Sequence, residues 1–581
     1  MAVLVLAILA LASPAYAADP RPPTPEPNFA VNLLPRPCAL EGNDPYERHF
    51  YEVEGWTGPN YERYPGACQR LRFAYGPILV KPGQNDVLVG PVTIEKPAQD
   101  GYITRFRPDL VLPDGTVPPI EQVHLHHGTW LSEPDYGHGP FFAAGEEKTI
   151  APFPKGYGMP IKATDQWQLL YMVHSAIQKP QVVYITYDID FVPAAKAKQV
   201  GLKPAYPVWL DVRPSAYPVF NTQRDFGNSS GTCTWPKDKC ATFDPWGKRF
   251  TGQGEEGNGR GTDYTLPTKG QNLGRAGPFT GGTLVGIGGH LHPGGLHNDI
   301  DLVRGGQSER IYTSKADYWD RKDQSKVGGP ADSWDFSMEV NGLPKWGVHV
   351  EPGDVLRSNA TYDTTIQSTY EDMGIAVALL APDKDGKPTA PGVNPFTAPK
   401  DTSPTCESGG LEAGELCDKS GVVTHGHLHE NDNYSGPSGN WSNPKPGAAT
   451  GNVGILNFLY EPGDESTISM TGLPTVKLGT SLSFSNLDGG SIYHTVTSCA
   501  FPCLGPTGTA FPLGDGKTST GRKLDFDSAE LGVGTPQIGP AKQKLNWKLP
   551  VTAAAGYKPG EVVTYYCRIH PGMRGAFEVT K

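Results

Sequence analysis

The sequence predicts an all-β protein built from several domains. Gly and Pro number 71 and 57 among 581 residues, as expected for a chain with many turns. Runs that alternate Val, Thr and Tyr with polar residues recur, whereas long stretches of helical periodicity are nearly absent. Because the chain is too long for one hydrophobic core, we expect about three domains.

The N-terminus predicts export. Residues 4–12 form an apolar run that small residues follow, a pattern typical of a secretory signal peptide cleaved near Ala17. The run is shorter than the roughly 20 residues that a membrane-spanning helix needs, and no later stretch is long enough either. We therefore expect residues 1–17 to be a signal peptide, residues 18–74 to be a Pro-rich and aromatic extension, and the protein to be secreted, extracellular or periplasmic.

Cysteine usage agrees with export. The chain has nine cysteines, an odd number, so disulfide pairing leaves one over. Disulfides persist in oxidising compartments. The sequence does not fix the pairing, but the simplest set joins near neighbours: Cys38 with Cys68, Cys233 with Cys240, Cys406 with Cys417, and Cys499 with Cys503. Cys567 then remains for another task.

The first candidate metal site lies in a histidine-rich strand. His124 and His126 are two residues apart, so their side chains share one face of a strand. The neighbours His126 and His127 diverge unless a bulge or strand end intervenes. His174 lies on another alternating run and supplies one more imidazole. Three imidazoles suit copper, zinc, iron or nickel, and their spacing alone does not choose among these metals.

A second candidate site follows further along the chain. His290 and His292 form a His-x-His pair that Pro and Gly residues end, and Met373 closes a Glu-Asp-Met tripeptide downstream. Taken alone, the pair is typical of hydrogen-bonded surface histidines and the methionine is typical of a core residue.

In this order, the two motifs resemble the copper type II monooxygenase family, which includes the peptidylglycine and dopamine monooxygenases. The resemblance spans about residues 75–385. It implies two jelly-roll-like β-sandwich domains, at residues 75–198 and 199–384, that hold one copper each on either side of a solvent-filled cleft. By position, His126, His127 and His174 match the electron-donating site, and His290, His292 and Met373 match the catalytic site that binds dioxygen.

Three features depart from this family. His124 competes with His127 as a ligand, on the strand-face argument above. Gly374 stands where the family has a cysteine directly after the methionine ligand. No residues match those that bind a peptide carboxylate or a catecholamine, so the resemblance implies no particular substrate.

Residues 385–420 predict a Pro/Gly-rich linker. Past it, His425, His427 and His429 would line one face of a strand and could bind a metal, although a solvated polar edge segment is the favoured explanation.

The strongest chemical signal is near the C-terminus. Cys567, His570 and Met573 lie in one loop after an alternating strand, and His494 lies in an earlier strand. Two imidazoles, a thiolate and a weak axial thioether are the ligands of blue, type 1 copper. This part of the chain resembles the cupredoxin family, with a loop spacing similar to that of the amicyanins. The resemblance implies a Greek-key β-sandwich at residues 421–581 that transfers one electron at a time.

Together these motifs predict a secreted multi-copper oxidoreductase. It would activate dioxygen to hydroxylate an unknown small organic substrate, with a fused blue-copper domain that takes electrons from ascorbate or a redox protein. The cofactors would be one type 1 copper and two mononuclear type II-like coppers. The net charge of −11 disfavours nucleic acid as a partner. The alternatives are an extracellular electron-transfer protein without oxygenase activity, and a copper store that binds four or more ions with the help of the His425, His427 and His429 run.

Overall fold

Nearly all regular structure in this computed structural model is β-strand, which confirms the predicted all-β fold class. The short helices α2 (Ala194–Ala197) and α3 (Ile468–Thr471) each make about one turn. The structure describes residues 35–40, 51, 55–56, 60–81, 84, 88–118, 123–133, 140–145, 150–175, 180–212, 219–222, 226–240, 263–292, 294–318, 336–338, 340–341, 346–364, 369–398, 445–488, 492–499, 501, 503, 524–534, 542–568 and 573–581.

The first unit is a sandwich of two antiparallel sheets, apart from one short parallel pair at an edge. Bulky side chains from both sheets, among them Phe106, Trp130 and Tyr187, stack between them and fill the core. One sheet has the order β1 (Gln69–Val80), β9 (Gln181–Pro193), β3 (Gly101–Val111), β7 (Tyr157–Ile161) and β10 (Lys203–Pro204), with β6 (Ala151–Pro152) on β3. The other has the order β2 (Val89–Ile94), β8 (Gln166–Ser175), β4 (Val123–Glu133) and β5 (Phe142–Gly145).

The second unit repeats this architecture, with a core that Leu284, Ile300 and Leu356 help to form. One sheet has the order β11 (Tyr206–Asp211), β23 (Ile375–Pro382), β15 (Gly282–His290) and β19 (Val340–Asn341), with β20 (Val348–Val350) on β15. The other has the order β13 (Thr232–Trp235), β21 (Val355–Asp363), β16 (Gly295–Arg304), β17 (Gln307–Tyr318) and β18 (Phe336–Met338), with β14 (Tyr264–Thr265) on β21. A separate ribbon pairs β12 (Phe220–Thr222) with β22 (Thr369–Asp372).

The third unit mixes parallel and antiparallel strands, and Phe484, Tyr565 and Phe577 lie in its core. One sheet has the order β24 (Pro446–Ala449), β27 (Leu473–Lys477), β34 (Arg574–Thr580), β33 (Val562–Tyr566) and β29 (Thr497–Cys499). The other has the order β26 (Leu459–Glu461), β25 (Asn452–Leu456), β28 (Thr480–Asn486) and β32 (Asn546–Val551). The hairpin of β30 (Gly532–Gly534) and β31 (Lys542–Lys544) stands apart from both.

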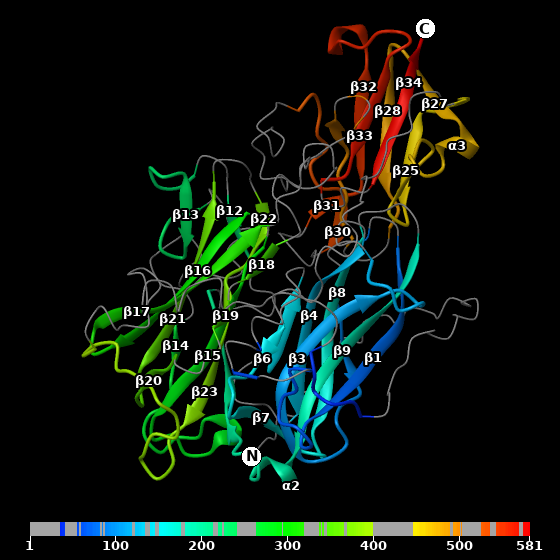
Figure 1. Cartoon of the computed structure of the whole chain (residues 1–581). Coiled ribbons are helices and arrows are strands. Elements are labelled where there is room, and N and C mark those ends of the chain that lie inside the picture. The colour runs from blue at the N-terminus through cyan, green and yellow to red at the C-terminus, as the bar shows by residue number, and fades with distance from the viewer. Residues whose placement is uncertain are drawn as a thin grey trace, which may run out of the picture.

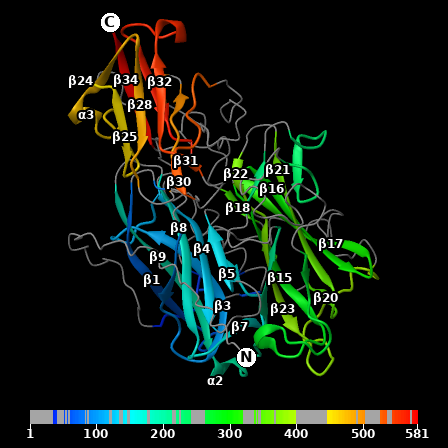
Figure 2. The same cartoon turned by 180° about the vertical axis from the view of Figure 1, so that it is seen from behind.

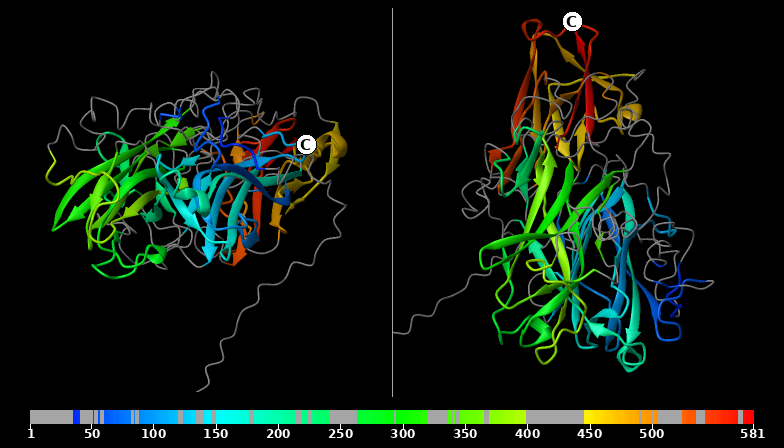
Figure 3. Two further views of the ribbon diagram at one scale, coloured as in Figure 1. Left: turned by 60° about the horizontal axis from the view of Figure 1, so that its bottom comes forward. Right: turned by 60° about the vertical axis from the view of Figure 1, so that its left-hand side comes forward.

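The first two units lie side by side, and the third lies above the first (Figure 1, and from behind in Figure 2). The two further views in Figure 3 show the same three units. Val285 and Ala381 of the second unit belong to the buried cluster of the first. Arg275 donates hydrogen bonds to Asp165 (2.6 Å) and to Ser132 (3.1 Å) across the same junction. Met373 belongs to the buried cluster that fills the third unit. The three units therefore share packed interfaces.

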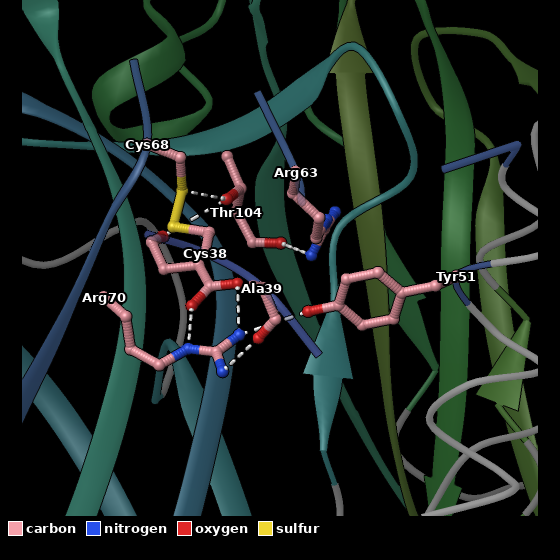
Figure 4. The surroundings of a disulfide bond; sticks show 8 residues. Cys38, Ala39, Tyr51, Arg63, Cys68, Arg70 and Thr104 are labelled. Carbon is pink, nitrogen blue, oxygen red and sulfur yellow. Dashed lines mark hydrogen bonds and ion pairs between the residues drawn. A yellow bond between two sulfur atoms is a disulfide. The ribbon is translucent and has the colours of Figure 1, made fainter. Parts of the chain in front are cut away.

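The N-terminal extension is fastened to the first unit by a disulfide and a buried arginine (Figure 4). Cys38 and Cys68 are bonded. Arg70 donates to both carboxylate oxygens of Asp190 (2.7 and 3.0 Å) and to the carbonyl oxygen of Ala39 (2.7 Å). Burial alone would raise the pKa of Asp190, but the neighbouring arginine charges lower it below its usual value. A paired charge is the arrangement that a buried carboxylate requires.

Two more of the predicted disulfides, Cys233–Cys240 and Cys499–Cys503, are also present. The fourth predicted pair, the signal peptide and the His425, His427 and His429 run lie outside the described residues. Among the helices in the described ranges, none has the length and apolar character to cross a membrane.

We predict that Arg70→Met destabilises the first unit by about 3–5 kcal/mol, because it leaves the Asp190 carboxylate buried without its partner. The contribution of the pair is present above the ordinary aspartate pKa of about 3.9 and is lost as the pH falls through the lower folded-state pKa. Urea unfolding measures the change. Lys162→Met is the control, since it removes an exposed ion pair with Asp100 and is expected to cost about 0–1 kcal/mol. Equal effects of the two variants would contradict the prediction.

Candidate metal centres

A β-bulge in β4 brings the first histidines together. His124 pairs with His174 on β8 and His127 pairs with Met172, so His126 is an extra residue in β4. The bulge turns adjacent side chains toward each other, and the ring centroids of His126 and His127 lie 4.3 Å apart. This is the local condition under which two neighbouring histidines of a strand can face one ion.

The imidazoles form two groups that share His126. Ligand atoms of His124, His126 and His174 all lie within 4.8 Å of one another, and so do those of His126, His127 and His292. The first group comes from β4 and β8 alone, whereas the second joins the first unit to the second. His124 therefore occupies the place beside His126 and His174 that the family resemblance gave to His127, and His127 faces the second unit instead.

The closest contact lies across the junction of the two units. Nε2 of His127 and Nε2 of His292 are 2.9 Å apart. Metal–nitrogen bonds are about 2.0–2.1 Å long, so two nitrogens at this 2.9 Å separation would subtend roughly a right angle at a shared ion. The ring centroid of His290 lies 5.6 Å from that of His127. The donor atoms thus fit a metal ion that both units hold.

Tyr362 connects His292 with Met373. Its buried hydroxyl accepts the backbone N–H groups of His292 (2.8 Å) and Met373 (3.1 Å) and donates to the carbonyl oxygen of Met373 (2.8 Å). His290 ends β15 opposite Ile375, so the two chain segments meet at the ends of paired strands. The sequence did not identify Tyr362 as a site residue, because no motif marks a tyrosine that acts through backbone groups.

The structure explains the glycine after Met373. A Cβ atom at Gly374 would lie 2.5 Å from the Cβ of Ala360 and 2.9 Å from the side chain of Val212. No side chain fits there without displacing the backbone, so the cysteine that the resemblance implies at this position is excluded by packing.

Four of the six imidazoles are buried, whereas His127 and His290 are half-buried. The exposed fraction is 3% for His124, His174 and His292 and 1% for His126. Burial holds the pKa of His126, His127 and His174 well below its usual value, and the neighbouring imidazoles lower it further. Neutral imidazole is the form that binds metals, so these side chains need lose no proton to act as ligands.

A separate site lies in the third unit. Nε2 of His494 is 2.8 Å from Oδ2 of Asp488, and the Sγ atom of Cys567 accepts the backbone N–H of Thr495 at 3.3 Å. Burial would lower the pKa of His494, but Asp488 and Cys567 raise it above its usual value. His494, Cys567 and Met573 are all fully buried. The fourth predicted ligand, His570, lies outside the described residues.

A hydrogen-bonded clamp fixes the loop that carries Cys567. The backbone N–H of Arg568 donates to Oγ1 of Thr495 (2.8 Å), and its guanidinium pairs with Asp527 at 2.7 Å. Thr497 donates to the other oxygen of Asp527 at 2.9 Å. The clamp holds the cysteine loop against the segment that carries His494, as the supporting groups around a metal site do.

No family profile and no curated protein matches the sequence. Solved structures of cupredoxins are similar to part of this chain. A mutant of amicyanin in its Cu(I) form shares 21% identity over 22% of this chain and 79% of that chain, with a TM-score of 0.12. A novel purple cupredoxin from Nitrosopumilus maritimus shares 17% identity over 22% of this chain and 100% of that chain, with a TM-score of 0.13. Likeness at this level assigns neither a metal nor an activity to this chain.

We predict that the metal-free protein loses stability as the pH falls below about 6.5, because the unfolded chain protonates these histidines while the folded chain keeps them neutral. Each such histidine contributes about 1.4 kcal/mol per pH unit until its folded-state pKa is reached. Urea unfolding at several pH values measures the slope. His126→Gln should reduce the slope of unfolding free energy against pH by about 1.4 kcal/mol per pH unit, the contribution of one histidine. An unchanged slope in that variant would contradict the prediction.

Proposed function

We propose that this chain is an exported copper redox protein in which a cupredoxin-type site supplies electrons to an imidazole centre shared by the first two units. The observation that carries the proposal is the 2.9 Å approach of the His127 and His292 nitrogens, which brings donor atoms of both units to one place. The three disulfides among the described residues support export, because such bonds are typical of oxidising compartments.

The ligand set of the third unit favours copper. Cys567 offers a thiolate, His494 and His570 offer imidazoles and Met573 offers a thioether, the combination that suits type 1 copper. Asp488 holds Nε2 of His494, which leaves Nδ1 for the ion. Copper in such a site exchanges one electron, and the fixed positions of Cys567 and His494 keep the rearrangement small.

The imidazole centre needs a redox-active metal if it is to receive electrons. Zinc has no redox chemistry, so copper is the metal that fits both the ligands and the neighbouring site. We assign His124, His126 and His174 to an electron-accepting copper. His290, His292 and Met373, with His127 from the first unit, would hold a second copper, which would supply the site for reaction with dioxygen.

The reaction that suits this arrangement is hydroxylation of a small organic substrate. One dioxygen, two electrons and two protons convert a C–H bond into C–OH and release one water. An external donor, ascorbate or a redox protein, provides the two electrons through the third unit. Tyr362 holds the Met373 segment against His292, and burial of the imidazoles limits the access of water.

Burial also favours a second candidate function, electron transfer without an oxygenase reaction. His292 is only 3% exposed, and an organic substrate must approach the ion that His292 binds. In that case the imidazole centre would only store or relay electrons, and the reduced protein would consume no oxygen.

We predict that Cys567→Ser abolishes the intense visible absorption of the copper-loaded protein, because that absorption requires the thiolate. Bound copper should fall by about one ion per chain. His174→Gln should also lose copper but keep the visible band, so the two variants separate the two kinds of site. A full visible band in Cys567→Ser would contradict the assignment.

We predict that Met373→Leu retains the visible band but lowers oxygen uptake by the reduced protein by at least an order of magnitude. The reason is that the thioether would be lost from the ion that reacts with oxygen, while the Cys567 thiolate that the visible band requires is retained. Met159→Leu is the matched control, since Met159 is also buried but lies in the core of the first unit. Equal oxygen uptake by both variants would favour electron transfer alone.

A further inference from the structure

A strained hairpin tip lies next to the cupredoxin-type site. Asn457 and Phe458 form the two-residue turn between β25 and β26, where Leu456 pairs with Leu459. Both turn residues have positive φ, 54° and 62°. Such turns favour Asn followed by Gly, so Asn457 suits its position, whereas a phenylalanine in the left-handed region is sterically unfavourable. A strained backbone conformation of this kind persists only where contacts with the surrounding structure hold it in place, and such residues are common at functional sites.

The strained backbone directs the Phe458 ring toward His494. Phe458 is fully buried, and its ring meets the His494 ring edge-on with centroids 5.4 Å apart. Asp488 binds both residues through one oxygen, which lies 3.2 Å from the backbone nitrogen of Phe458 and 2.8 Å from Nε2 of His494. The hairpin tip is therefore anchored to the same carboxylate that orients the metal ligand.

The Phe458 ring also contacts the first unit. Nζ of Lys81 lies 5.7 Å from the centroid of the Phe458 ring, within the range of a cation–π contact. The backbone N–H of Lys81 donates to Oε1 of Gln84 at 3.0 Å. The side chain of Gln84 in turn donates from Nε2 to the carbonyl oxygen of Val173 (3.4 Å). The backbone carbonyl oxygen of Gln84 accepts the N–H of Ser175 (2.8 Å). Val173 and Ser175 are the two neighbours of His174 in β8.

We propose that Phe458 is the contact that docks the third unit on the first and couples their redox sites. The route runs from His494 through Phe458, Lys81 and Gln84 to His174. One electron passes along it from the reduced cupredoxin-type site to the oxidised His124, His126 and His174 site, and no bond is made and no proton moves. The proposal has two parts. The redox half, electron transfer through Phe458, rests on the proposed function. The docking half, contact between the third and first units through Phe458, applies to the metal-free chain as well.

The redox half is tested by intramolecular electron transfer in the copper-loaded full chain. The variants are Phe458→Gly, which also creates the favoured Asn-Gly turn, and Phe458→Leu, which keeps an apolar side chain. After rapid reduction of the cupredoxin-type site without oxygen, the return of the visible band reports the transfer rate. Both variants should keep the band but slow its return by at least an order of magnitude.

Phe484→Leu is the control, because Phe484 is equally buried but packs against Trp547 and Tyr565 in the core of the third unit. An unchanged rate in both Phe458 variants, or equal slowing by Phe484→Leu, would overturn the route.

The docking half is tested without metal by small-angle X-ray scattering. Phe458→Gly should increase the radius of gyration of the metal-free chain relative to the wild type and to Phe484→Leu, because the third unit loses its contact with Lys81. An unchanged radius would overturn docking through Phe458. Absence of a visible band in the copper-loaded wild type would instead overturn the proposed function, and the scattering result would still decide the docking.

Discussion

The approach of His127 to His292 is the constraint on which the rest of the molecule depends. A 2.9 Å contact between nitrogens of two units requires both to be placed accurately. The bulge at His126 turns His127 outward, Tyr362 fixes the backbone of His292, and Arg275 ties the units together at Asp165 and Ser132. Val285 of the second unit also packs into the core of the first unit.

Burial of several neighbouring imidazoles lowers the free energy of unfolding of the metal-free chain, and this cost links folding to metal binding. Burial lowers the pKa of His126 and His174 well below its usual value, which favours their neutral form in the folded chain. A bound metal would offset the cost, because its free energy of binding would add to that of folding. Metal occupancy and the docking of the first two units are therefore expected to be thermodynamically coupled.

In the third unit, hydrogen bonds and ion pairs from charged side chains hold His494 and Cys567 in place. Asp488 orients His494 from one side, and the Arg568–Asp527 clamp holds the Cys567 loop from the other. Charged groups outside the predicted ligand set thus position His494 and Cys567, as is typical of metal sites. Phe458 extends this support to the surface that meets the first unit.

Local features of the structure could be predicted from the sequence. Alternation and turn residues predicted the all-β fold, and short spacing predicted the disulfides of Cys233 and Cys499. Strand periodicity put His124 and His126 on one face. The bulge at His126 could not be predicted, because one inserted residue leaves no mark on the alternation. The His127–His292 contact spans 165 positions along the chain, so no local pattern indicates it.

A crystal structure of the copper-loaded chain, with anomalous scattering measured at the copper edge, would locate the bound ions directly. We expect one ion beside His494 and Cys567, one among His124, His126 and His174, and one bound by both His127 and His292. Copper only on surface histidines, or a first ion bound by His127 rather than His124, would contradict this expectation.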